Sequence, residues 1–161
     1  MTLTTSKPLG TSFTPRRFAW LAAATVTVLA LAACGLAMAA SRDIARPAPA
    51  EFGLGPRTSS NGRYLVTLET DAALRRGKLQ TIRAAIRDAE GHPIVEAGIA
   101  IDGGMPQHGH GLPTRPRVSR ELGDGRYEIA GVRFNMGGWW EFRLTITGPA
   151  GSDVVTFNLD L

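Results

Sequence analysis

The chain has 161 residues and a sequence isoelectric point near 10.0, with 18 basic and 14 acidic side chains. Three basic residues, Lys7, Arg16 and Arg17, lie in the first 41 residues, which hold no acidic residue, so the rest of the chain is nearly neutral. Because no basic stripe with interleaved aromatic residues follows, composition excludes nucleic acid as a partner and leaves one modest domain behind a leader.

Residues 18–41 form an uncharged, mostly apolar run between Arg17 and Arg42. A helix of about 20 residues spans the hydrocarbon core of a bilayer, and preceding basic residues keep the N-terminus in the cytoplasm. A buried core helix of this length would carry a polar face, which is absent here. We therefore predict that residues 1–41 are a signal or anchor segment with a hydrophobic helix. The domain would then sit at the bacterial cell membrane, facing the periplasm or the cell exterior.

The form of the anchor stays open. Residues 31–35 (LAACG) resemble a bacterial lipobox, which makes Cys34 the lipidation candidate. Residues 37–39 (AMA) also fit the pattern of ordinary signal cleavage. The apolar run continues past Cys34, which favours an uncleaved transmembrane helix. We weigh lipoprotein and uncleaved anchor equally and disfavour release. Because Cys34 is the only cysteine, no disulfide forms within the domain.

Residues 42–61 contain Pro47, Pro49 and Pro56 together with several glycines and serines. Such a composition disfavours both a helix and a strand ladder. We predict a flexible, extended linker that holds the following domain, residues 62–161, away from the bilayer.

Strand signals recur through residues 62–161, separated by turn signals. Apolar residues alternate with polar ones over residues 64–68, 82–86, 95–101, 139–147 and 155–161. Residues 117–122 and 126–134 flank a glycine-rich hairpin signal at residues 123–125 (GDG). Leu79, Ile82 and Ile86 also fit helical spacing, but a hairpin-like turn at residues 90–93 favours a strand there. About seven short strands in 100 residues predict an all-β fold, an immunoglobulin-like β-sandwich.

Two histidines and two methionines suggest a metal site. His108 and His110 lie in a glycine- and proline-rich segment, residues 102–116, with one glycine between them. In an extended segment, residues two apart point the same way, so both imidazoles could reach one ion. Met105 precedes them, and Met136 lies in a turn between two predicted strands. Thioethers with imidazoles suit copper, especially Cu(I), whereas a structural zinc site normally needs thiolates that the domain lacks. The alternative is a long connection with exposed, hydrogen-bonding histidines, and we interpret His92 as an ordinary turn residue.

The paired tryptophans differ in the face they occupy. Trp140 shares its face with Phe142 and Leu144, which predicts a core position. Trp139 falls on the opposite, polar face near Met136. There its ring could cap a soft cation, contact a partner, or cover the sheet surface.

Three segments together are similar to a known family: residues 102–114 (DGGMPQHGHGLPT), 123–127 (GDGRY) and 134–141 (FNMGGWWE). They resemble the YtkA-like domain family, related to FixH-like proteins, over about residues 62–161. The resemblance implies an extracytoplasmic immunoglobulin-like sandwich behind an N-terminal anchor. It also implies a link to copper supply and haem–copper oxidase assembly, with Met105, His108, His110 and Met136 as the positions to carry over.

We therefore expect a membrane-anchored binding domain that holds copper, or passes it to or from a partner protein. The alternative is a metal-free interaction domain of a membrane complex, built on the same loop and Trp139. An enzyme is the least favoured class, because no nucleophile elbow and no phosphate-binding glycine motif occur.

Overall fold

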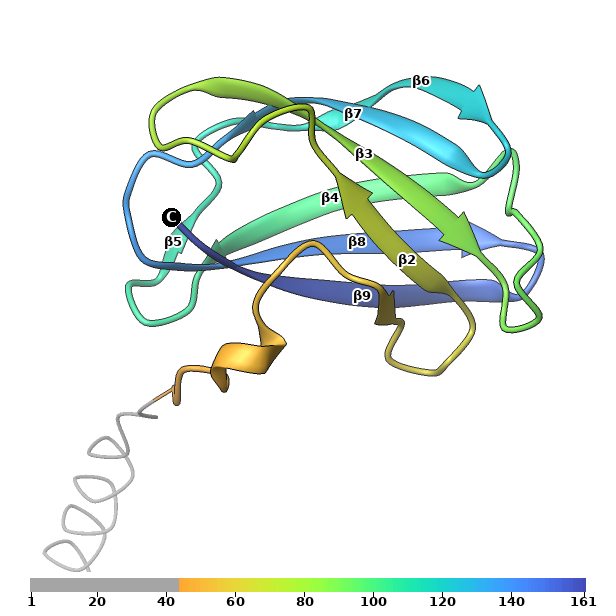
Figure 1. Ribbon diagram of the computed structural model, residues 1–161, viewed down its shortest axis with the longest axis horizontal. Coiled ribbons are helices and arrows are strands. Elements are labelled where there is room, and N and C mark those ends of the chain that lie inside the picture. The colour runs from red at the N-terminus through yellow and green to blue at the C-terminus, as the bar shows by residue number, and fades with distance from the viewer. Residues whose placement is uncertain (1–43) are drawn as a thin grey trace, which may run out of the picture. The chain divides into compact units, whose positions relative to one another are not determined.

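The computed structural model describes residues 44–161, so the predicted leader and Cys34 lie outside the described part of the chain. Residues 44–161 fold into two antiparallel sheets that face each other (Figure 1). One sheet has the order β1-β2-β3-β7-β6 and the other the order β5-β4-β8-β9. The strands are β1 (Arg57–Thr58), β2 (Leu65–Glu69), β3 (Leu79–Arg87), β4 (Gly98–Met105), β5 (His110–Gly111), β6 (Arg117–Gly123), β7 (Arg126–Arg133), β8 (Trp139–Gly148) and β9 (Gly151–Asp160), and a 3-10 turn, η1, covers Pro49–Glu51.

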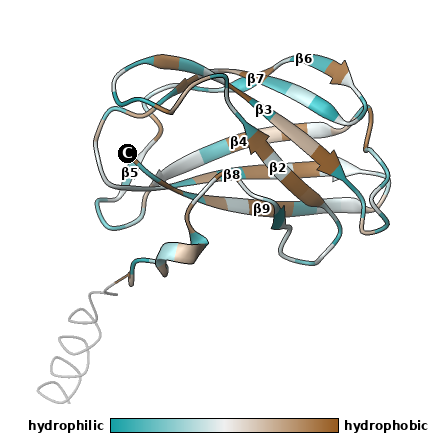
Figure 2. Cartoon of the chain, viewed as in Figure 1, coloured by the Kyte–Doolittle hydropathy of each residue, from teal (hydrophilic) through white to brown (hydrophobic). Residues whose placement is uncertain are grey.

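The predicted all-β sandwich is confirmed. All seven predicted strands form, and the two-residue strands β1 and β5 join them. In β3 the side chains of Ile82, Ala84 and Ile86 are fully buried and alternate with more exposed neighbours, so the helical alternative for this segment is wrong. Hydrophobic stretches are visible along β2 and β3 in Figure 2.

The core lies between the two sheets and is rich in aromatic side chains. Trp140, Phe142, Leu144 and Ile146 of β8 are fully buried, as their period-2 spacing predicts. Phe134 meets the rings of Trp140 and Phe142 edge to face, with ring centroids 5.3 and 6.3 Å apart. These contacts fix the turn between β7 and β8, which carries Met136.

The predicted strand over residues 95–101 is wrong in its first three residues. The strand begins at Gly98, Val95 is 51% exposed, and Ile94 is the buried residue. Glu96 adopts a left-handed backbone conformation (φ 55°), which breaks the strand. Tyr127 secures this bend, since its hydroxyl donates to the Ile94 carbonyl and accepts from the Ala97 amide.

The predicted linker also differs from the structure. We refer to residues 44–56 as the strap, because they lie along the sheet that contains β9. The Gly53 amide donates to the Asn158 carbonyl (2.9 Å), and the Leu54 carbonyl accepts from the Leu68 amide (2.6 Å). Residues 57–58 then form β1, so the prediction that no ladder forms here is wrong. Proline removes its own N–H group, but the residues between the prolines keep theirs, and an exposed sheet edge offers partners for them.

A buried carboxylate of β9 holds the connection between β1 and β2. Asp153 is 3% exposed and accepts hydrogen bonds from the Ser59 hydroxyl (2.6 Å) and from the Asn61 backbone and side chain. Burial alone would raise the pKa of Asp153. Together, the bonds from Ser59, the Val154 amide and Asn61 outweigh this effect and hold the pKa well below its usual range. Asp153 is therefore ionised and structural.

No helix within residues 44–161 is long and apolar enough to cross a bilayer.

Candidate metal centre

A tight hairpin presents the two histidines. Met105 of β4 pairs with His110 of β5, and Gly104 pairs with Gly111. The amides of His108 and Gly109 both donate to the Met105 carbonyl, at 3.0 and 2.9 Å. Gly109 has a φ of 63°, which glycine adopts without the steric cost of a side chain. The hairpin tip is therefore closed by backbone hydrogen bonds, and its histidine side chains are exposed.

The imidazoles of His108 and His110 lie side by side. Their ring centroids are 6.3 Å apart and the ring planes differ by 24°. The expected reason for this closeness was an extended segment, but His108 lies in the turn and only His110 lies in a strand. The turn itself brings the two rings together.

Met136 reaches His110 from a different connection. The Met136 Sδ atom lies 3.3 Å from the His110 Nδ1 atom, although the two residues are 26 positions apart. First-row metal ions bind nitrogen at about 2.0 Å and sulfur at about 2.3 Å, so two ligand atoms of one ion lie at most about 4.3 Å apart. The Trp140 indole N–H donates to the Met136 carbonyl (3.0 Å), which orients the turn. Nitrogen and sulfur are therefore within reach of one ion.

The side chain of Met105 is buried, unlike those of the two histidines. Its side chain is 1% exposed and belongs to the hydrophobic core. Its terminal methyl lies against Gly138, where an added Cβ would be 3.3 Å away, and cross-strand pairing places it beside His110. Met105 is thus a buried thioether whose backbone pairs with that of the exposed His110.

Trp139 is not the exposed residue that we expected. It is only 4% exposed, and its indole N–H donates to the Asn158 Oδ1 atom (2.9 Å). Asn158 in turn contacts the strap, because its amide nitrogen lies 3.4 Å from the Glu51 carbonyl. The polar face of the sheet is covered at this point, so Trp139 cannot cap an exposed cation. Sequence parity could not reveal this cover, since it comes from a distant segment.

Charged residues beside the hairpin are already paired. Arg143 bonds Asp102 (2.7 Å) and Glu141 (2.9 Å) at the edge of a shallow depression that His110 and Ile44 also line. The hydrogen bond from Arg143 lowers the pKa of Asp102. Asp102 is therefore held as an ionised partner of Arg143 and is poorly placed to act as a base.

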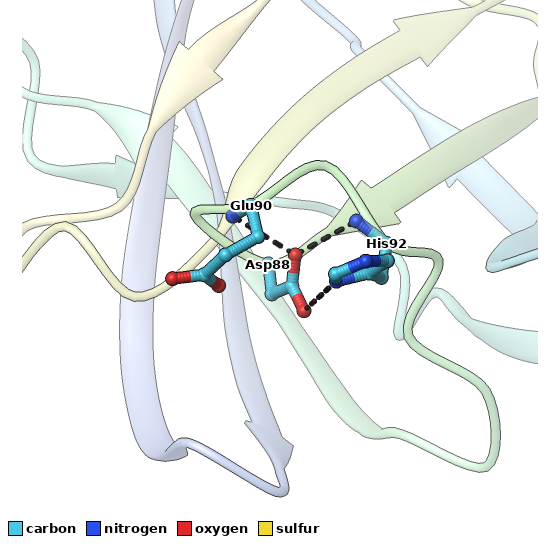
Figure 3. A group of neighbouring side chains, drawn as sticks. All are labelled: Asp88, Glu90 and His92. Carbon is cyan, nitrogen blue, oxygen red and sulfur yellow. Dashed lines mark hydrogen bonds and ion pairs between the residues drawn. The ribbon is translucent and has the colours of Figure 1, made fainter.

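A second group of possible ligands lies in the turn between β3 and β4, where Asp88, Glu90 and His92 gather (Figure 3). The Asp88 carboxylate accepts from the amides of Glu90 (3.0 Å) and His92 (2.7 Å) and contacts the His92 ring (3.1 Å). Partial burial would raise the pKa of Asp88, but the bonds from His92 and Glu90 together lower it. The group closes its own turn, which agrees with our interpretation of His92.

Comparison with known proteins identifies the family of the domain. The family model described as YtkA-like matches residues 59–145, which is more than half of the chain. No curated protein matches. Among solved structures, the ZirS C-terminal Domain is similar, with 16% identity, 76% of this chain and 90% of that chain covered, and a TM-score of 0.39. The chain belongs to the YtkA-like family.

Proposed function

We propose that this YtkA-like protein is a membrane-anchored, extracytoplasmic, non-catalytic module that binds copper and exchanges it with a partner protein. The ligands would be His110 and Met136, with His108 and Met105 completing the set. The observation that carries the proposal is the 3.3 Å separation of the Met136 sulfur and the His110 ring nitrogen, supplied by two separate connections. Nitrogen and thioether ligands without thiolate suit Cu(I) better than Zn²⁺ or Mg²⁺.

The exposure of the ligands supports transfer rather than permanent storage. His108 and His110 are exposed and Met136 is half-buried, so a partner's ligands could approach the ion from solvent. The buried Met105 lies on the far side of the hairpin from solvent and would keep one soft donor in place during such an exchange. Neither His108 nor His110 bonds a carboxylate within residues 44–161, so no ion pair there competes with a metal ion for their ring nitrogens.

The test is an anaerobic Cu(I) titration in detergent. The full chain is used because the strap is part of the folded domain. Replacing both His108 and His110 by Ala, or Met136 by Leu, should lower Cu(I) affinity by more than the roughly 10- to 100-fold that loss of outer-shell partners costs. The matched control is His92→Ala, which removes the remaining histidine and should leave affinity unchanged. Unchanged affinity in the double histidine variant would refute the copper site.

A metal-free contact surface on a membrane complex is the second candidate. The residues of the hairpin tip, 107–111, are exposed and could meet another protein. Trp139 cannot take part, since it is buried. A partner cross-linked through this tip that is retained after chelation and in the double histidine variant would favour this function.

The role in haem–copper oxidase assembly, which the FixH-like resemblance implies, is a proposal of its own. It predicts that deleting the gene lowers the copper content of the oxidase and that added copper restores it.

A further inference from the structure

Charged side chains are segregated between the two ends of the sandwich. Because neighbouring strands are antiparallel, connections 70–78, 106–116 and 134–138 lie at the end that carries β5, which we call the His/Met end (Figure 1). These connections hold four basic residues, Arg75, Arg76, Lys78 and Arg115, and one acidic residue, Asp71. Connections 59–64, 88–97, 124–125 and 149–150 lie at the opposite end. They hold one basic residue, Arg63, and four acidic ones, Asp88, Glu90, Glu96 and Asp124.

The basic residues of the His/Met end are not neutralised by neighbours. Among the ion pairs of residues 44–161, none includes Arg75, Arg76, Lys78 or Arg115. The one acidic residue in these connections, Asp71, is paired with Arg83 (2.6 Å). These connections therefore carry four positive charges and one negative charge, and none of the four basic side chains forms an ion pair within residues 44–161.

The basic connection lies beside the candidate metal centre. The Gly77 amide donates to the Phe134 carbonyl (2.6 Å), and the Arg76 guanidinium packs against Gly137, next to Met136. The guanidinium groups and the exposed histidines thus share one end of the molecule.

The chain also enters the domain at this end. The Gln107 side-chain amide lies 3.4 Å from the carbonyl of Ile44, the first described residue. Arg46 bonds Asp160 at the end of β9 (2.7 Å) and stacks over Phe52 at 4.9 Å, which holds the strap there. Only residues 42 and 43 separate Ile44 from the predicted end of the leader, and a residue extends the chain by at most about 3.6 Å.

We propose that the His/Met end docks on an anionic lipid surface, with Arg75, Arg76, Lys78 and Arg115 contacting lipid phosphates. The proposal rests on the membrane attachment proposed above and does not depend on copper. Each basic side chain near such a surface strengthens association about fivefold. The three basic residues of connection 70–78 together therefore contribute roughly a hundredfold. Docked in this way, the candidate copper ligands would face proteins embedded in the same membrane.

The test is hydrogen exchange of the full chain in vesicles of phosphatidylcholine alone and in vesicles that also contain phosphatidylglycerol. When the anionic lipid is present, amides of residues 70–78 and 106–116 should exchange at least about fivefold more slowly. They should not slow in phosphatidylcholine alone. Salt at about 1 M, which shortens the Debye length to about 3 Å, should remove the difference. Amides of residues 88–97 should not change.

The variant for this test combines Arg75→Glu, Arg76→Glu and Lys78→Glu, and it should abolish the lipid-dependent protection. Arg126→Glu, at the opposite end, is the matched control and should keep it. Thermal unfolding of both variants checks the fold, and Arg115→Glu gives a second, single-site measure. Equal exchange in the two lipids, or protection at residues 88–97, would overturn the proposal. A cross-link from the basic residues to an acidic protein without lipid-dependent protection would also overturn it.

The failure of docking can be distinguished from the failure of copper binding. The double variant Arg75→Glu with Lys78→Glu leaves Arg76 beside Met136 in place, so it should weaken docking and still bind Cu(I) as the unmodified chain does. Loss of the chain from vesicles of both compositions would refute the membrane attachment together with the docking.

Discussion

Asp153 shows how one side chain can organise a segment remote in sequence. It lies near the start of β9, is almost completely buried, and gathers donors from Ser59, Asn61 and the Val154 amide. An ionised carboxylate that accepts several hydrogen bonds is stabilised relative to its protonated form. The strength of this anchor should therefore depend on pH.

Because the pKa of Asp153 is lowered by folding, its contribution to stability is complete above the unfolded-state pKa of about 3.9 and is lost as pH falls below that value. Asp153→Asn should lower the denaturant midpoint at neutral pH and flatten the decline of that midpoint below about pH 3.9. Urea unfolding at several pH values measures both. The control is Asp124→Asn, an exposed turn carboxylate. Identical pH profiles for Asp153→Asn and the unmodified chain would contradict the role of Asp153.

At the scale of elements, the strap and β9 depend on one another through Asn158. Its backbone pairs with Gly53, and its side chain links the Trp139 indole to the Glu51 carbonyl. A buried indole N–H without an acceptor carries an unfavourable desolvation cost. The strap is thus stabilised by the same residue that satisfies Trp139.

Asn158→Ala should lower the free energy of unfolding by about 1–3 kcal/mol, because the Trp139 N–H loses its partner. It should also speed hydrogen exchange in residues 51–54. The neighbouring Thr156→Ala, on the same face of β9, serves as the control and should change stability by no more than about 0.5 kcal/mol. Equal urea midpoints for the two variants would show that the strap does not need Asn158.

At the scale of the whole molecule, stability comes from aromatic packing between the sheets, since the domain has no cysteine. Phe142 is fully buried, pairs with Phe157 across the β8–β9 ladder, and meets Phe134 edge to face. Phe142→Ala should cost about 3–5 kcal/mol of unfolding free energy. Val95→Ala, at a position that is 51% exposed, should cost no more than about 0.5 kcal/mol. Calorimetry or urea unfolding distinguishes the two, and a small effect of Phe142→Ala would place the stabilising core elsewhere.

The sequence by itself determined the strands and their buried faces, because period-2 alternation is a local property that each segment of β3, β8 and β9 carries alone. It also indicated the candidate ligands, since residue types and a family resemblance need no coordinates. Only the tertiary structure decided that Met136 meets His110 and that the strap covers the sheet beside Trp139. These contacts join segments 26 and more than 100 residues apart, and their existence depends on which strands pair and at which end their connections fall.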